Sequence, residues 1–320
     1  MRNKNKRLPD DQARNDGQTR PENQKNDRMN DFAPYGQASF FETAEEKLNS
    51  AVSSDSLPQL ASELRAELSD LYLAFQRFVP EESRDACHEL DMYAAHIDRT
   101  YFRLLRTVNN MNATANLRDP RSYRMEPWNI VDVVGIICDK SAEVAGYKNV
   151  DLRFMHHMDR HVILFDRSAI ETALYQLLSN ALRFTPSGGE IRVALHDAGD
   201  KLYLEVSDTG RGMSDQEREA VFQRCISWDQ EQNSLSPAKL SLGLPLCHAA
   251  ARNHGGTLMA LSRRGIGSTF MLSIPNRAPT YMQTARQRET MDFDDNGFDP
   301  VLLALADAAP VEAFSVRNRY

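Results

Sequence analysis

Apolar side chains recur at every third or fourth position in two stretches of the first half of the chain. The first stretch has them at Leu57, Leu60, Leu64, Leu68, Leu71, Phe75 and Phe78. The second has them at Leu90, Ala94, Ile97, Tyr101, Leu104, Val108 and Met111. This spacing puts each set on one face of a helix. Because Pro80 ends the first helix, the pattern predicts an antiparallel helical hairpin over residues 57–117.

The two apolar faces are too long for a hairpin to bury by itself. Helices in proteins depend on the burial of such faces for most of their stability. A four-helix bundle built from two copies of the chain would cover both faces. The pattern therefore predicts a homodimer that is held together by the hairpin.

Residues 125–276 alternate between helical periodicity and the two-residue periodicity of strands. Strands are expected at 151–154, 162–165, 191–195, 202–206, 257–262 and 268–274. Helices are expected over 130–144, after the capping residue Asp166, and over 244–253. This order predicts a sheet that is covered by helices on one face. The chain is thus expected to be α+β, with a helical hairpin followed by an α/β sandwich.

The segments on either side of these two regions are more polar. Residues 1–35 are expected to form a disordered tail, because charged side chains there greatly outnumber apolar ones. Residues 36–56 are expected to be a linker. Residues 277–320 are expected to form a C-terminal tail with one short apolar segment, Val301–Leu305. Docking of this segment on its own domain or on a partner is the alternative.

The charge balance excludes some classes of function. The chain has 38 Lys and Arg against 45 Asp and Glu, a net charge of −7, which argues against a nucleic-acid binder held by bulk electrostatics. Its longest strongly apolar run, about residues 242–251, is too short for a membrane span. The lack of a secretory signal and of paired cysteine spacings is typical of a cytoplasmic protein.

The helix expected after Asp166 carries a polar face that could bind a metal ion and phosphate. Gln176, Asn180 and Arg183 lie at positions i, i+4 and i+7, opposite the apolar stripe. An amide oxygen can complete the octahedral coordination of Mg²⁺ beside phosphate oxygens and water. An arginine can bind phosphate through its planar fork. A plain polar helix face is the alternative interpretation.

Two glycine-containing segments add candidate ligand contacts. In Asp208-Thr-Gly-Arg-Gly212, Gly210 and Gly212 let the backbone turn sharply and approach a ligand closely. Asp208, at a strand end, can accept a hydrogen bond from an amino group such as that of adenine. The second segment, Lys239-Leu-Ser-Leu-Gly-Leu244, opens a helix, and the free N–H groups there favour an anion.

In this order and spacing, the segments resemble the ATP-binding domain of sensor histidine kinases and of the related gyrase, heat-shock-protein and mismatch-repair ATPases. Residues 177–186 resemble the family's asparagine-containing helix, and 208–212 its first glycine motif. Residues 221–222 resemble its short phenylalanine motif, and 241–244 its second glycine motif. The resemblance covers about residues 57–275 and implies that the chain binds ATP with Mg²⁺.

The resemblance also implies roles for individual residues. Asn180 would hold Mg²⁺, Arg183 would bind the phosphates, and Asp208 would bind the adenine amino group beside Phe184. The other expected nucleotide contacts are Gly210, Gly212, Gly243, Leu244 and, on a phosphate, Lys239. In the family, glycines stand at the positions of Lys239 and Ser241. Each replacement costs on the order of 1–2 kcal/mol if φ is positive there, so a reduced affinity is expected.

The hairpin resembles the family's dimerisation and phosphoacceptor domain, whose acceptor motif reads His-Glu-Leu-Arg-Thr-Pro-Leu. The aligned stretch here is Ser62-Glu-Leu-Arg-Ala-Glu-Leu68, so Ser62 occupies the histidine position. Neutral imidazole is a nucleophile near pH 7, whereas a serine hydroxyl needs an aligned base, and Glu63 is the residue that could serve. His88 and His96 are weaker candidates, because neither lies at the family's acceptor position.

Two functions remain open on the sequence. The first is an ATP-dependent protein phosphotransferase of the two-component histidine kinase type that acts in a phosphorelay, although Ser62 replaces the acceptor histidine; Glu63 is its candidate base. The second is a catalytically silent pseudokinase, a nucleotide-binding dimer that regulates a partner kinase or response regulator. The retained Asn180 and Asp208 favour the first, whereas Ser62 and the altered second glycine motif favour the second.

Overall fold

A computed structural model of the chain describes residues 57–118, 123–230, 242–279 and 299–318. All of these residues belong to one compact unit. The tail and the linker that the sequence predicts at 1–35 and 36–56 lie outside the described residues, and so do Lys239 and Ser241.

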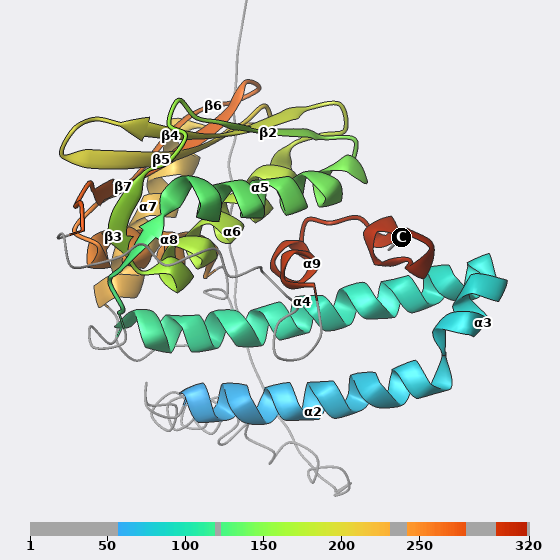
Figure 1. The fold of residues 1–320 in the computed structure, drawn as a ribbon. Helices are drawn as coiled ribbons and strands as arrows, with labels where there is room; N and C mark the ends of the chain where they lie inside the picture. Colours follow the sequence, from blue (N-terminus) through green and yellow to red (C-terminus); the bar gives the residue numbers. More distant parts are fainter. Residues whose placement is uncertain (1–56, 119–122, 231–241, 280–298, 319–320) are drawn as a thin grey trace, which may run out of the picture. The chain divides into compact units, whose positions relative to one another are not determined.

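The helical hairpin consists of α2 (Leu57–Phe78) and α4 (His88–Arg118), which lie side by side (Figure 1). A short helix, α3 (Glu81–Ala86), occupies the turn between them, with Pro80 as its N-cap. The rings of Tyr72 and Tyr101 stack between α2 and α4, with their centroids 4.0 Å apart. The hairpin expected from the periodicity is therefore present, with an additional helix in its turn.

Within one chain, the hairpin buries only part of the two apolar series. Ala61 and Tyr72 of α2 are buried, and Leu68 and Phe75 are partly buried against them. A stripe of large apolar side chains, here called the exposed stripe, remains on the surface: Leu60, Leu64, Leu71, Phe78, Ile97 and Leu104. The dimer that would cover this stripe stays a prediction.

The α/β region contains a five-stranded sheet in the order β2-β4-β5-β7-β6. The strands are β2 (Asp151–Met155), β4 (Glu190–Asp197), β5 (Lys201–Asp208), β6 (Leu258–Arg263) and β7 (Gly267–Pro275). β2 pairs with β4 in parallel, and the other pairs are antiparallel. Two further strands, β1 (Glu126–Asn129) and β3 (Val162–Phe165), form a separate ladder. β1 was not expected, because Glu-Pro-Trp-Asn shows no alternation and Pro tolerates only an edge position.

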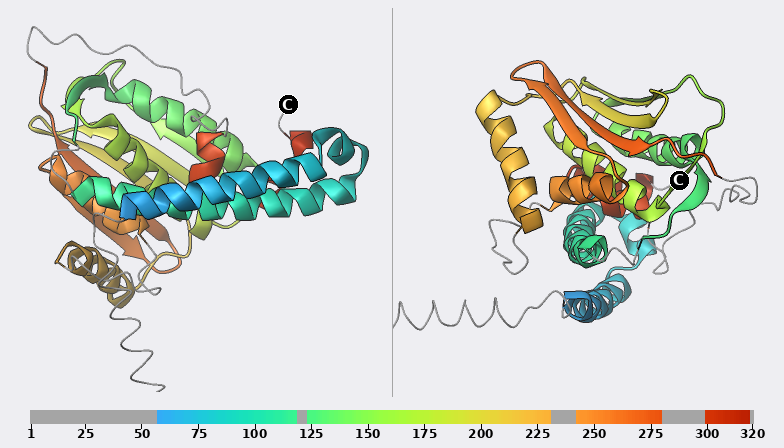
Figure 2. Two further views of the ribbon diagram at one scale, coloured as in Figure 1. Left: turned by 90° about the horizontal axis from the view of Figure 1, so that it is seen from below. Right: turned by 90° about the vertical axis from the view of Figure 1, so that its left-hand side faces the viewer.

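One face of the sheet is covered by α5 (Ile130–Gly146), α6 (Arg167–Phe184) and α8 (Gly243–Asn253) (Figures 1 and 2). Alternate residues of β4 and β5, such as Val193 and Leu204, are buried beneath these helices. The carboxylate of Asp166 caps α6 by accepting a hydrogen bond from the Ala169 N–H at 2.8 Å, as the sequence predicts. The expected α+β fold, a hairpin followed by an α/β sandwich, is confirmed.

A helix that the sequence did not predict, α7 (Asp215–Gln230), follows the first glycine motif. Its sequence lacks apolar periodicity, but a reciprocal cap starts it. Ser214 Oγ accepts from the Glu217 N–H at 3.2 Å, and a Glu217 carboxylate oxygen accepts from the Ser214 N–H at 2.8 Å. The local cap therefore forms this helix where the apolar pattern gives no signal.

The C-terminal segment, residues 299–318, differs from the tail that the sequence favours. It forms α9 (Pro300–Leu305) and two 3-10 turns, η3 (Val311–Phe314) and η4 (Val316–Asn318). The segment contacts α4, α5 and α6, and both Val301 and Phe314 are 0% exposed. Asp299 caps α9 by accepting from the Val301 N–H at 2.7 Å. Its apolar side chains pack because α4, α5 and α6 together provide a surface that no local sequence pattern reveals.

Candidate nucleotide-binding site

A cavity of about 510 Å³ lies where α6, the loop after β5, the start of α8 and α4 meet. Its lining includes seven of the expected nucleotide contacts: Asn180, Arg183, Phe184, Asp208, Gly212, Gly243 and Leu244. Gly210 lies beside this group, because its N–H donates to Asp208. The structure therefore brings together every expected nucleotide contact that falls within the described residues.

Asp208 forms one end of the cavity. It ends β5, is 8% exposed, and accepts a hydrogen bond from the Gly210 N–H at 2.8 Å. Burial raises the pKa of its carboxyl group, while hydrogen bonds from the Gly210 and Ser268 backbone oppose that rise. A Cβ at Gly210 would lie 2.6 Å from both Asp208 and the Phe184 carbonyl oxygen. Only glycine fits so close to the carboxylate.

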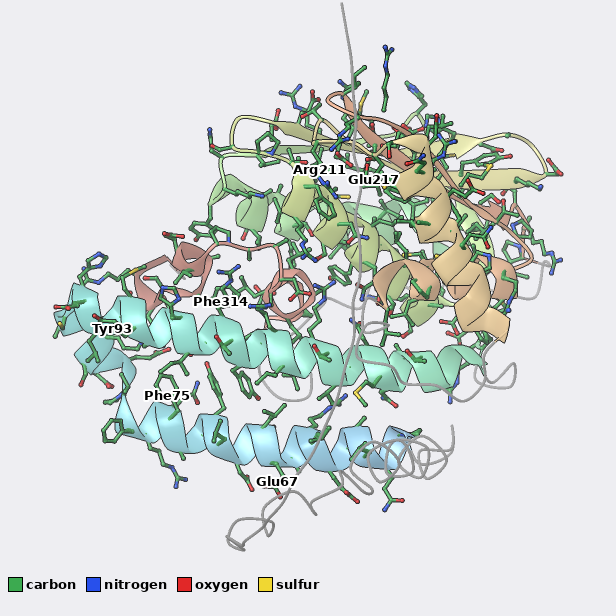
Figure 3. All side chains as sticks on the ribbon, turned by 180° about the vertical axis from the view of Figure 1, so that it is seen from behind. Glu67, Phe75, Tyr93, Arg211, Glu217 and Phe314 are labelled. Atoms are coloured by element: carbon green, nitrogen blue, oxygen red, sulfur yellow. The ribbon has the colours of Figure 1, made fainter. Side chains whose placement is uncertain are left out.

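The polar face of α6 forms one wall of the cavity. The side chains of Gln176, Asn180 and Arg183 line it, as the i, i+4, i+7 spacing predicts. The guanidinium groups of Arg183 and Arg211 lie 5.5 Å and 5.0 Å from the centroid of the Phe184 ring. Arg211 also faces Glu217 of α7 at 3.6 Å, and Figure 3 shows these two side chains next to each other.

Three residues of the hairpin helix α4 also line the cavity, although no motif in the sequence points to them. Arg103, Arg106 and Asn110 line the cavity at positions i, i+3 and i+7 of α4. Arg106 Nη2 donates to Gln176 Oε1 at 2.7 Å, and Gln176 Nε2 donates to Asn110 Oδ1 at 2.7 Å. A polar stripe at helical spacing was the available signal, but it gives no sign of which domain it faces.

The same part of the cavity contains one carboxylate from the C-terminal segment. Asp307 forms ion pairs with Arg103 Nε at 3.1 Å and with Arg106 Nη1 at 2.6 Å. Burial is the main cause that lowers the pKa of the Arg106 guanidinium. Asp307 opposes this shift, and the positive charge of Arg183 adds to it. Two arginines of α4 therefore share the Asp307 carboxylate.

The start of α8 places the described part of the second glycine motif on the cavity. A Cβ at Gly243 would lie 3.0 Å from Gln176 Oε1, so glycine permits the close approach of α8 to α6. Leu242 and Leu244 add apolar surface to the lining. Lys239, the expected phosphate contact, lies outside the described residues.

Ser62 and Glu63 do not line the cavity. Both are exposed on α2, and α4 lies between α2 and the α/β region (Figures 1 and 2). Glu63 accepts a hydrogen bond from Gln59 Nε2 at 3.2 Å rather than facing a reacting group. Glu67, at the family's proline position, projects away from α4 (Figure 3). The arrangement thus brings neither the acceptor candidate nor its base to the cavity.

The described residues contain no cluster of His, Cys, Asp and Glu that could hold a metal ion by itself. The amide of Asn180 lines the cavity and is a group that can bind Mg²⁺ beside phosphate oxygens. Across the same ranges, no helix is both long and apolar enough to cross a membrane.

Residues 165–278 match the family described as histidine kinase-, DNA gyrase B- and HSP90-like ATPase. Sensor protein IrlS of Burkholderia pseudomallei is 30% identical over 224 residues, which are 68% of this chain and 46% of the relative. Sensor-like histidine kinase SenX3 of Mycobacterium tuberculosis is 30% identical over 130 residues, 41% of this chain and 32% of the relative. The chain thus spans less than half the length of these curated relatives.

The crystal structure of full-length ShkA in complex with AMPPNP shares the fold. It superimposes with a TM-score of 0.54 at 20% identity, over 70% of this chain and 46% of that chain. The match includes more of the chain than residues 165–278, as expected if the hairpin is also shared. Residues 165–278 therefore form an ATPase-type domain of the histidine kinase-, DNA gyrase B- and HSP90-like family, and the chain is similar to sensor histidine kinases beyond that domain as well.

Proposed function

We propose that the cavity binds an adenine nucleotide together with Mg²⁺. The observation that carries the proposal is that the buried carboxylate of Asp208 and a group of arginines line the same cavity. Asp208 lies near Phe184 at the end of α6, and Arg106 of α4 donates a hydrogen bond to Gln176. Eight helical residues separate Phe184 from Gln176, a rise of about 12 Å, which suits an elongated ligand with an amine at one end and anions at the other. The cavity volume is also in the range of small-molecule sites.

Each residue has a role that follows from its chemistry. Asp208 accepts a hydrogen bond from the adenine amino group, and the exposed ring of Phe184 lies beside the base. The amide oxygen of Asn180 is a ligand for Mg²⁺, which would neutralise charge on the phosphates when bound. Arg183 binds phosphate through its guanidinium group.

We further infer that the chain is a signalling protein that binds nucleotide as a dimer and acts on a response regulator or a partner kinase. The supporting observation is the position of Ser62 and Glu63, which face solvent on the far side of α4 from the cavity. In this arrangement the Ser62 hydroxyl lies away from the cavity, and Glu63 accepts a hydrogen bond from Gln59, whereas a serine nucleophile needs an aligned base. Phosphotransfer to Ser62 is the second candidate function, favoured by the retained Glu63 beside it.

Calorimetric titration with Mg-ATP tests nucleotide binding. We expect Asp208→Asn to reduce the affinity by at least tenfold, because it removes the anionic acceptor for the adenine amino group. Glu205→Gln is the matched control, since Glu205 lies on the same strand but does not line the cavity. Equal affinities of wild type and Asp208→Asn would contradict the assignment of this residue.

Incubation with γ-labelled ATP and Mg²⁺ separates the two functions. The regulatory function predicts no label on the protein. Acid-stable label that is lost in Ser62→Ala would establish phosphotransfer to this serine instead, and acid-labile label would point to a histidine.

A further inference from the structure

Arg106 occupies an unusual place for a residue of the hairpin. It is the most buried arginine of the cavity lining, at 7% exposure, although it comes from α4 and not from the ATPase-type domain. Two of its nitrogens are paired, with Asp307 and Gln176, but Nε is buried without a hydrogen-bond partner among the described residues. A buried donor of this kind is costly unless a ligand or water satisfies it.

The charges around Arg106 also do not balance. Arg103, Arg106 and Arg183 all line the cavity, and Asp307 is the one carboxylate that pairs with any of them within the described residues. Arg183 adds to the lowering of the pKa of Arg106, as a second positive charge in the same cavity does. An excess of positive charge in a partly enclosed cavity favours a ligand with several negative charges.

We propose that Arg106 is a phosphate-binding residue of the nucleotide site. In the free protein Asp307 is the counter-ion of Arg103 and Arg106, and the phosphates replace it when nucleotide binds. The inference rests on the proposed nucleotide binding and adds a regulatory step to it. Asp307 lines the same cavity with 40% of its side chain exposed. Its carboxylate and a phosphate compete for the same guanidinium groups and repel each other at short range.

The exchange has a consequence for the C-terminal segment, which is held at two separate places. Asp307 holds its middle part on α4 through Arg103 and Arg106. Its end is held at the hairpin turn, where Arg84 donates to the Phe314 carbonyl and Asp91 accepts from Ser315 and Val316. Nucleotide binding should therefore loosen residues 306–310, while the anchor at Asp91 stays in place.

Titrations with Mg-ATP and with adenosine test the proposal, because adenosine has no phosphates. We expect Asp307→Asn to bind ATP several-fold more tightly than wild type, and Arg106→Gln to bind ATP at least tenfold more weakly. Both variants should bind adenosine as wild type does, which also shows that they are folded. Arg77→Gln removes the same charge as Arg106→Gln, but at an exposed position of α2. It should change neither the affinity for ATP nor that for adenosine.

Hydrogen exchange of the full chain gives a second readout. Addition of Mg-ATP should speed exchange of the amides of residues 306–310, and adenosine should not. The amide of Val316, held by Asp91, should remain protected under both conditions.

If wild type and Arg106→Gln bind ATP with the same affinity, the role of Arg106 is overturned, but the proposal that the cavity binds nucleotide still holds. Weaker ATP binding by Asp307→Asn would overturn the exchange in the same way. Failure of the wild type to bind either ligand would overturn the proposed function itself, and the inference with it.

Discussion

Burial of Asp208 at the end of β5 raises the pKa of its carboxyl group above the ordinary value of 3.8. The folded protein therefore keeps this proton to a higher pH than the unfolded chain does. As the pH rises from about 3.8 through the raised pKa, Asp208 ionises in the folded protein and the free energy of unfolding falls. Above that pKa the whole cost of burying the ionised carboxylate is present. A residue that is unfavourable for stability but placed for a ligand is typical of a binding site.

We predict that Asp208→Asn stabilises the protein without ligand at pH 7. The amide keeps an oxygen that can accept from the Gly210 N–H but carries no buried charge. The gain should be roughly 0.5–2 kcal/mol in the free energy of unfolding, measured by urea denaturation. The gain should shrink as the pH is lowered toward 3.8, where Asp208 itself becomes protonated. An equal difference at both pH values would show that the buried charge is not its cause.

Residues of the site differ in how far they could be predicted. Asn180, Arg183 and Asp208 were found because each lies in a short motif whose spacing has a local chemical meaning. Arg106 was not found, because its partners Gln176 and Asp307 are 70 and 201 positions away. Contacts at such separations depend on how the domains pack and leave no trace in local periodicity.

At the scale of elements, the long helices and the main strands were predicted because their apolar patterns repeat over several turns or pleats. The exceptions are short or locally determined. α3 has six residues and no apolar face, and α7 depends on the Ser214–Glu217 cap. α9 needs α4, α5 and α6 to bury its side chains. The apolar series of α2 is partly exposed in one chain, as expected for a hairpin that cannot bury both faces by itself.

The exposed stripe yields a prediction at this scale. Leu64 and Leu71 are 39% and 66% exposed in one chain, so their replacement costs a monomer little. If two hairpins form a four-helix bundle, Lys at both positions places charge in a buried interface. We predict that Leu64→Lys with Leu71→Lys shifts the protein from dimer to monomer in sedimentation experiments. Leu261→Lys, on β6 and 63% exposed, is the control and should leave the dimer intact. A double variant that stays dimeric would place the interface elsewhere.

At the scale of the whole described unit, a buried ionic network joins the hairpin turn to the C-terminal segment. Arg84 is paired with Asp91 and Asp98 at 3.0 Å and 2.8 Å, and all three side chains are at most 4% exposed. Such a group is stable only while every member has its partners. Ser315 and the Phe314 carbonyl complete it, so the hairpin turn and the chain end stabilise each other.

Phe314 provides the apolar part of this anchor. Its ring is 0% exposed and lies 5.5 Å from that of Phe102 on α4, and Figure 3 shows it beneath the segment, against that helix. We predict that Phe314→Ala lowers the free energy of unfolding by about 3–5 kcal/mol, because the segment cannot refill the space. Tyr93→Ala, at a 64% exposed position of the same helix, should change it by no more than about 0.5 kcal/mol. Urea denaturation measures both. A loss as small for Phe314 as for Tyr93 would mean that the apolar contact with α4 contributes little to stability, and that the polar anchor at Arg84 and Asp91 alone holds the end of the segment.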